Sequence, residues 1–147
     1  MNNNNNHYMG IEMNNQTWSL LDKKDRSEQD DIRMINYAKA SLFHWSKSDK
    51  HTIVNKQRGK WLISHVYVIL GKSDEALSYA KETLKITKDN NLKDFDLAYA
   101  YESMARAYLI ANNQNESKEW YKKAKVVGDL IVNEKDKEYF LLDLNSK

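Results

Sequence analysis

Apolar residues recur at every third or fourth position along most of the chain, which is the period of an amphipathic helix. The spacing is clearest from Ile35 through Ala38 and Leu42 to Trp45, at intervals of three, four and three. No segment has a strand pattern of any strength. The expected helices lie near residues 18–21, 28–45, 52–70, 73–88, 94–111, 120–131 and 134–144. The sequence therefore predicts an all-α protein of about seven helices joined by short links.

Capping residues mark several of the predicted helix ends. Ser27 precedes the acidic run 28–31, Asp94 precedes the fifth helix, and both residue types are preferred N-caps. Gly71 stands where a helix needs a left-handed terminating residue. The chain has no proline and only four glycines, which leaves little turn chemistry for a many-stranded β fold.

The N-terminal segment, residues 1–16, is rich in asparagine and shows no apolar periodicity. It also lacks the basic-then-apolar order of a signal peptide. We predict a disordered tail for residues 1–16 and a single helical domain for residues 17–147.

Positions 41 residues apart resemble one another in the second half of the chain. The matched pairs are Tyr67 and Tyr108, Gly71 and Asn112, Glu75 and Glu116, Ala76 and Ser117, and Tyr79 and Trp120. An internal repeat of this length predicts helical hairpins that stack on one another and bury a continuous core between neighbours.

The segment 67–80, with its turn sequence L-G-K-S-D-E-A-L, resembles a tetratricopeptide (TPR) repeat at the junction of its two helices. The repeat differs from the usual TPR, whose period is about 34 residues and which often carries a proline after its second helix. Further motifs resemble small bacterial TPR-like proteins of unassigned function. These motifs are W-S-L-L-D from Trp18, D-R-S from Asp25, S-L-F-H-W ending at Trp45, R-G-K-W-L-I-S from Arg58, D-F-D-L-A-Y-A-Y-E from Asp94 and D-K-E-Y-F-L-L-D-L from Asp136. The resemblance implies a TPR-like, right-handed stack of antiparallel helix hairpins and leaves the chemistry open.

Charge is nearly balanced, with 23 basic and 21 acidic residues and a formal net charge of +2. The two signs alternate along the helices, whereas a nucleic-acid-binding protein usually has a concentrated basic stripe. The basic groups at 122–125 and at Lys56, Arg58 and Lys60 have the pattern of solvated helix faces. No segment has the apolar length of a membrane-spanning helix. We expect a cytoplasmic protein that binds neither nucleic acid nor membrane.

Residues with catalytic or metal-binding chemistry are present without the spacing that such chemistry needs. The chain has no cysteine and four histidines, none of them in an H-x-x-x-H or E-x-x-H pattern. Ser64 and His65 are adjacent, so on a helix their side chains point in different directions. We therefore expect no enzymatic activity, no cofactor and no metal. The alternative is a small-molecule or metal-binding protein that uses His44, His65, Asp96 and Arg58 in a pocket between helices.

Stacked hairpins leave a groove along the first helix of each pair, where a peptide or a partner helix can bind. Arg58 lies three residues before Trp61, so both can share one helix face. We predict Arg58, Trp61, Tyr101 and Glu102 as ligand- or peptide-binding residues. Trp45 and Trp61 can equally be core residues, because aromatics at helical spacing usually pack. The expected function is a protein- or peptide-binding module, whose partner is a peptide, another protein or a second copy of the chain.

Overall fold

A computed structural model describes residues 3–146 of the chain, and α-helices make up nearly all of this range. The helices are α1 (Asn3–Asp22), α2 (Glu28–Lys47), α3 (Ile53–Ile69), α4 (Ser73–Asp89), α5 (Phe95–Ile110), α6 (Gln114–Asp129) and α7 (Glu134–Asn145). Residues 3–146 contain no β-strand. The predicted all-α fold of about seven helices is confirmed.

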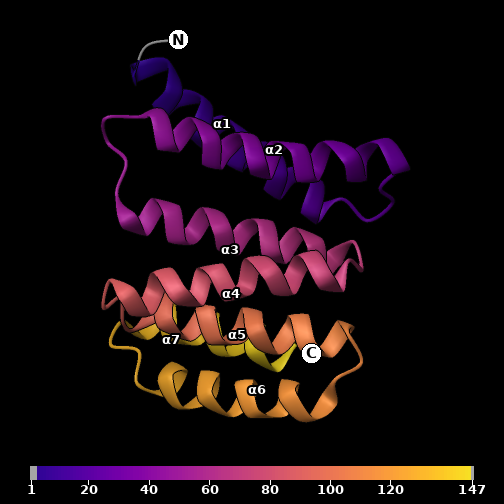
Figure 1. Cartoon of the computed structure of the whole chain (residues 1–147), viewed down its shortest axis with the longest axis vertical. Coiled ribbons are helices and arrows are strands. Elements are labelled where there is room, and N and C mark those ends of the chain that lie inside the picture. The colour runs from indigo at the N-terminus through magenta and orange to yellow at the C-terminus, as the bar shows by residue number, and fades with distance from the viewer. Residues whose placement is uncertain (1–2, 147) are drawn as a thin grey trace.

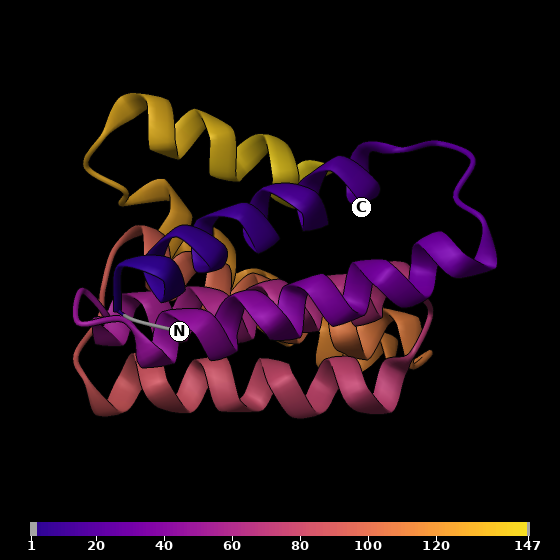
Figure 2. The same cartoon turned by 90° about the horizontal axis from the view of Figure 1, so that it is seen from above.

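The helices form three antiparallel hairpins stacked on one another, followed by α7 (Figure 1). The pairs are α1 with α2, α3 with α4 and α5 with α6. Successive hairpins contact each other through α2 and α3 and through α4 and α5, while α3 also contacts α5 directly. Viewed from above, α1 and α7 lie on the same side of the stack, opposite α4 (Figure 2). Helices α3 and α5 are therefore flanked by α1 and α7 on this side.

The asparagine-rich segment, predicted to be a disordered tail over residues 1–16, is instead helical in its described part and packs against α2. Residues 1–2 lie outside the described range. The buried Asn6 places its amide oxygen 2.9 Å from His44 Nδ1, and the Ser41 hydroxyl donates to the Gly10 carbonyl at 2.7 Å. The prediction failed because α1 packs through small and polar residues, which produce no apolar period.

Gly10 of α1 lies directly against the Trp45 side chain of α2. A Cβ atom at this position would lie 2.7 Å from Trp45 Cδ1, well inside van der Waals contact. His7 packs edge-on against the same indole, with ring centroids 4.9 Å apart. Trp45 is thus a packing residue between α1 and α2.

The predicted caps are present at the helix ends. The Ser27 hydroxyl accepts from the Asp30 N–H and the Asp30 carboxylate accepts from the Ser27 N–H, both at 3.1 Å, which is a capping box. The Asp94 carboxylate accepts from the Phe95 N–H at 2.7 Å. The start of α2 and the start of α5 are therefore fixed by local hydrogen bonds.

Turn geometry repeats at the predicted interval of 41 residues. Gly71 and Asn112, which follow α3 and α5, have φ angles of 73° and 61°. In each case the next N–H donates to the carbonyl five residues before it, at Tyr67 and Tyr108 respectively. The two helix ends are thus closed by the same left-handed turn, which glycine and asparagine adopt most easily.

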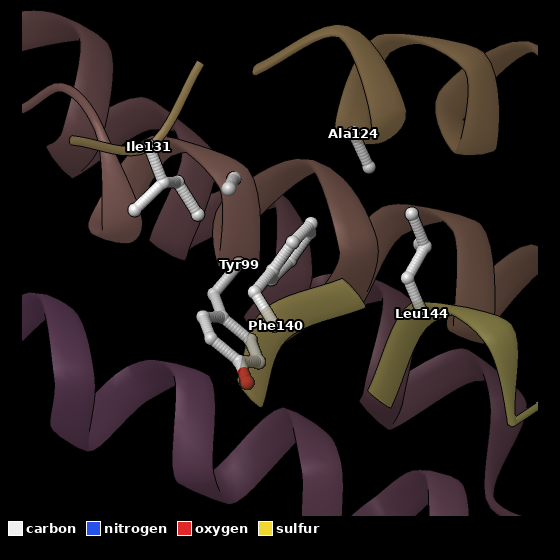
Figure 3. Packing of buried hydrophobic residues seen from close by; sticks show 6 residues of the cluster. Tyr99, Ala124, Ile131, Phe140 and Leu144 are labelled. Carbon is white, nitrogen blue, oxygen red and sulfur yellow. The ribbon is translucent and has the colours of Figure 1, made fainter. Parts of the chain in front are cut away.

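The last helix covers the end of the stack with large apolar side chains. Phe140 and Leu144 point from α7 toward α5 and α6, where they pack with Tyr99 and Ala124 (Figure 3). Gly128 of α6 has no room for a side chain, because an added Cβ would overlap the Phe140 ring. This packing fixes the position of α7 relative to α5.

Replacing Gly10 with leucine tests the docking of α1. Leucine has the higher helix propensity by about 0.8 kcal/mol, but its side chain cannot fit against Trp45. We expect Gly10→Leu to lower the free energy of unfolding by about 2 kcal/mol in urea titrations and to shift tryptophan emission to the red. The matched control is Asn15→Leu at an exposed position of the same helix. A Gly10→Leu protein as stable as this control would contradict the packed arrangement of α1.

Candidate ligand-binding pocket

A pocket of about 250 Å³ lies where residues of α1, α3, α5 and α7 meet; Figure 2 shows how these helices are arranged. All four of these helices contribute to its walls. Its aromatic lining residues are Trp18, Trp61, Phe95, Tyr99 and Tyr139, and its polar ones are Asn14, Gln57, Arg58, Asp96 and Asp143. We call this site the aromatic pocket.

Trp61 is the centre of the aromatic lining. Its indole is stacked on the His65 ring at 5.0 Å with an interplanar angle of 9°, and Trp18 from α1 is stacked on it at 6.2 Å. Tyr99 from α5 meets Trp61 edge-on at 5.4 Å. Aromatic pairs at these distances hold one another in place, so the pocket wall is formed before any ligand binds.

Arg58 lies at the rim of the aromatic pocket. Its Nε donates to Asp96 Oδ1 at 3.0 Å, and its guanidinium carbon lies 5.7 Å from the centre of the Phe95 ring. The Arg58 side chain is 59% exposed. Within residues 3–146 its terminal nitrogens make no hydrogen bond, so they are available as donors to a ligand.

Tyr99 and Asp143 join α5 to α7 at the other side of the pocket. The Tyr99 hydroxyl donates to Asp143 Oδ2 at 2.6 Å. Burial, and then this contact with a carboxylate, raise the pKa of Tyr99 far above its usual range, so the phenol stays protonated as a donor. Arg106 Nη2 donates to the Asp143 carbonyl at 3.0 Å, which is a second hydrogen bond between α5 and α7.

Gln57 is a buried lining residue of the pocket that links three helices through hydrogen bonds. Its buried side-chain amide donates to Thr87 Oγ1 at 3.0 Å and to the Asp96 carbonyl at 3.1 Å. These bonds join α3 to α4 and to the first turn of α5. They fix the register in which Arg58 meets Asp96.

The structure brings together two of the four predicted binding residues. Arg58 and Trp61 line the aromatic pocket, as their i, i+3 spacing predicts. Tyr101 lies elsewhere, where it packs on Trp120 at 5.8 Å, and the buried Glu102 is bonded to Arg106. Neither Tyr101 nor Glu102 lines the pocket.

The helical turn angle explains this separation on α5. Tyr99 lines the pocket and Tyr101 is two residues further on, so about 200° of rotation separates their side chains. The predicted binding residue Tyr101 therefore lies on a different face of α5 from the one that lines the pocket. The i, i+4 pair of Phe95 and Tyr99 was a signal available in the sequence, but Asn14, Tyr139 and Asp143 come from helices distant in sequence and carried no such signal.

The side chains of the small-molecule or metal alternative do not all converge. His44 bonds Asn6 between α1 and α2, whereas His65 packs against Trp61 on α3. Only Arg58 and Asp96 of that set meet in the aromatic pocket. The described residues contain no group of three or more potential metal-ligating side chains.

Among the helices of residues 3–146, none is long and apolar enough to span a bilayer.

No family model, curated protein or solved structure matches this chain. The side chains and geometry of its own surface are therefore the basis for assigning a function.

The pH dependence of unfolding tests the enclosure of His65. Burial against the indoles, and secondarily the charge of Arg106, lower the pKa of His65 from its usual 6.5 to about 4. The unfolded chain binds this proton more readily than the folded chain does. The free energy of unfolding is therefore not reduced by His65 above pH 6.5, and it falls as the pH decreases from 6.5 toward 4. Between pH 7.5 and pH 5 we expect the native protein to lose about 2 kcal/mol more than the variant His65→Phe, measured by urea titration. Equal losses in the two proteins would contradict this position of His65.

Proposed function

We propose that the chain is a TPR-like module that binds a peptide segment of a cytoplasmic partner protein and has no catalytic activity of its own. The observation that carries the proposal is the aromatic pocket, preformed between four helices with an exposed arginine at its rim. Aromatic and arginine side chains clustered in this way are typical of sites that dominate binding energy in protein interfaces.

The size of the aromatic pocket supports a peptide side chain as its occupant. At about 250 Å³ it lies below the range of roughly 300–1,000 Å³ that is usual for small-molecule sites. An apolar or aromatic side chain inserted against Trp61 and Tyr99 would fill most of this space. The rest of the segment would then lie along α3 and α5, between α1 and α7.

The polar groups at the rim would orient such a segment. The terminal nitrogens of Arg58 can donate to backbone carbonyls of the bound peptide, because only its Nε is bonded to Asp96. The Phe95 ring beneath the guanidinium and the carboxylate of Asp96 restrict its motion. Little side-chain entropy would be lost on binding, which favours affinity.

Selection of peptides from a random display library, followed by affinity measurement with labelled peptides, tests the proposal. We expect an enriched motif with a large apolar residue at a fixed position. The variants Arg58→Gln and Tyr139→Ala should each weaken binding at least fivefold, about 1 kcal/mol. Tyr139 lines the pocket yet is 58% exposed, so its removal leaves the core intact.

Matched control variants lie outside the aromatic pocket. Arg33→Gln and Tyr8→Ala alter side chains that are 56% and 63% exposed on α2 and α1. Both should change the dissociation constant by less than about twofold. The proposal fails if no motif is enriched, or if the four variants bind alike. Binding of a small molecule, but of no peptide, in the same pocket would favour the small-molecule alternative instead.

A further inference from the structure

A second cleft of about 490 Å³ lies between the first two hairpins. It is lined by residues of α2, α3 and α4 and by His51 from the link between α2 and α3. Its volume falls within the range of roughly 300–1,000 Å³ found for small-molecule sites. We call it the lysine cleft, after Lys39, Lys56 and Lys60 in its lining.

The lysine cleft and the aromatic pocket lie on opposite sides of α3. Arg58 and Trp61 line the aromatic pocket, whereas Lys56, Lys60 and Ile63 line the cleft. At 100° per residue, the mean directions of these two groups differ by about 200°. A ligand of the cleft would therefore not touch the proposed peptide site, and the two sites can be tested separately.

The cleft carries positive charge at its rim. Three of its lining side chains are lysines and none is acidic. Of the three, Lys60 has a carboxylate partner, Glu82 of α4, at 3.6 Å, a long contact. Lys39 lies over the Tyr67 ring and Lys60 over the Tyr79 ring, at 5.3 Å in both cases. Tyr79 itself lines the cleft, so its contact with Lys60 keeps that ammonium group beside the cleft.

His51 contributes an imidazole to the lining of the cleft. Its Nε2 atom is buried and has no hydrogen-bond partner in the described part of the chain. Buried polar atoms in folded proteins are almost always bonded, because an unmade bond is costly. The backbone N–H of His51 donates to the Ser48 carbonyl at 3.2 Å, which holds the residue in the wall of the cleft.

The inner wall of the cleft is apolar and aromatic. Leu42 and Phe43 contribute from α2, Ile63 from α3 and Tyr79 from α4. A ligand that fits both the wall and the rim has an apolar or ring-shaped body and an anionic head. Phosphate matches several ammonium groups and an imidazole better than a carboxylate does, because it has more charge and more acceptor oxygens.

We propose that the lysine cleft binds a phosphate-bearing small molecule, with the phosphate among Lys39, Lys56 and Lys60 and an apolar body against Phe43 and Tyr79. This site is distinct from the proposed peptide site, and its ligand would occupy the crevice between the first and second hairpins.

Titration of the full chain with phenyl phosphate, followed by calorimetry and by NMR of the imidazole signals, tests the proposal. We expect saturable binding with a dissociation constant of about 1 mM or lower at low ionic strength, together with a shift of the His51 ring signals. The double variant Lys39→Gln/Lys56→Gln should raise the dissociation constant at least tenfold. Benzyl alcohol, which has the ring but no charge, should bind much more weakly.

The matched control is Lys118→Gln/Lys122→Gln, which removes the same charge from exposed positions of α6. It should bind phenyl phosphate like the unaltered protein. Equal weakening in the two double variants would show a response to net charge alone and overturn the site. Absence of saturable binding would also overturn it, as would a polyglutamate peptide that binds the cleft more tightly than phenyl phosphate. None of these results depends on peptide binding in the aromatic pocket.

Discussion

Close packing of helices through small side chains sets the geometry of the whole stack. Ala76, Ala80 and Ala107 are fully buried where α4 and α5 meet their neighbours, and Gly10 and Gly128 allow α1 and α7 to approach. Helix axes can come close only where such residues face one another. Aromatic side chains occur both in the core and at the two sites. Phe140 is packed in the core beneath α7, whereas Trp61 lines the aromatic pocket and Tyr79 lines the lysine cleft. The two sites therefore border the packed helix interfaces.

In the second and third hairpins a serine hydroxyl bonds a backbone carbonyl of the paired helix, but the serine comes from the first helix in one hairpin and from the second helix in the other. In the second hairpin the Ser64 hydroxyl of α3 donates to the Ala76 carbonyl of α4, and in the third the Ser117 hydroxyl of α6 donates to the Ala105 carbonyl of α5, both at 2.8 Å. Ser64 and Ala105 are 41 positions apart, as are Ala76 and Ser117. One buried hydroxyl thus bridges each pair of helices, from opposite members of the pair. The repeat therefore includes an equivalent hydrogen bond, although the residues at the matched positions differ.

The sequence predicted those parts of the structure that local periodicity and capping determine. Helices α2 to α7 follow from the three-four spacing and from caps such as Ser27 and Asp94, because these signals act within a few residues. Most of helix α1 was missed and only its end near residues 18–21 was predicted, since its buried face contains Asn6, Gly10 and Thr17, which give no apolar period. Pairing along one helix likewise located Arg58 and Trp61. The pocket residues on α1 and α7 depend on tertiary packing, which no local pattern specifies.

Although the net charge is nearly neutral, the two sides of α3 carry different charges: the aromatic pocket contains both acidic and basic side chains, and the lysine cleft contains basic ones and no acidic one. In the sequence Lys56, Arg58 and Lys60 formed one basic group with the pattern of a solvated face. The helix turns Arg58 toward Asp96 in the aromatic pocket, on the side that also holds Asp143, and turns both lysines into the cleft on the other side. A composition average weights these residues equally, whereas a ligand experiences only the charges on the face that it touches. Two surfaces of different chemistry thus share one helix, and the buried Gln57 amide, which joins that helix to α4 and α5, holds them in a fixed relation.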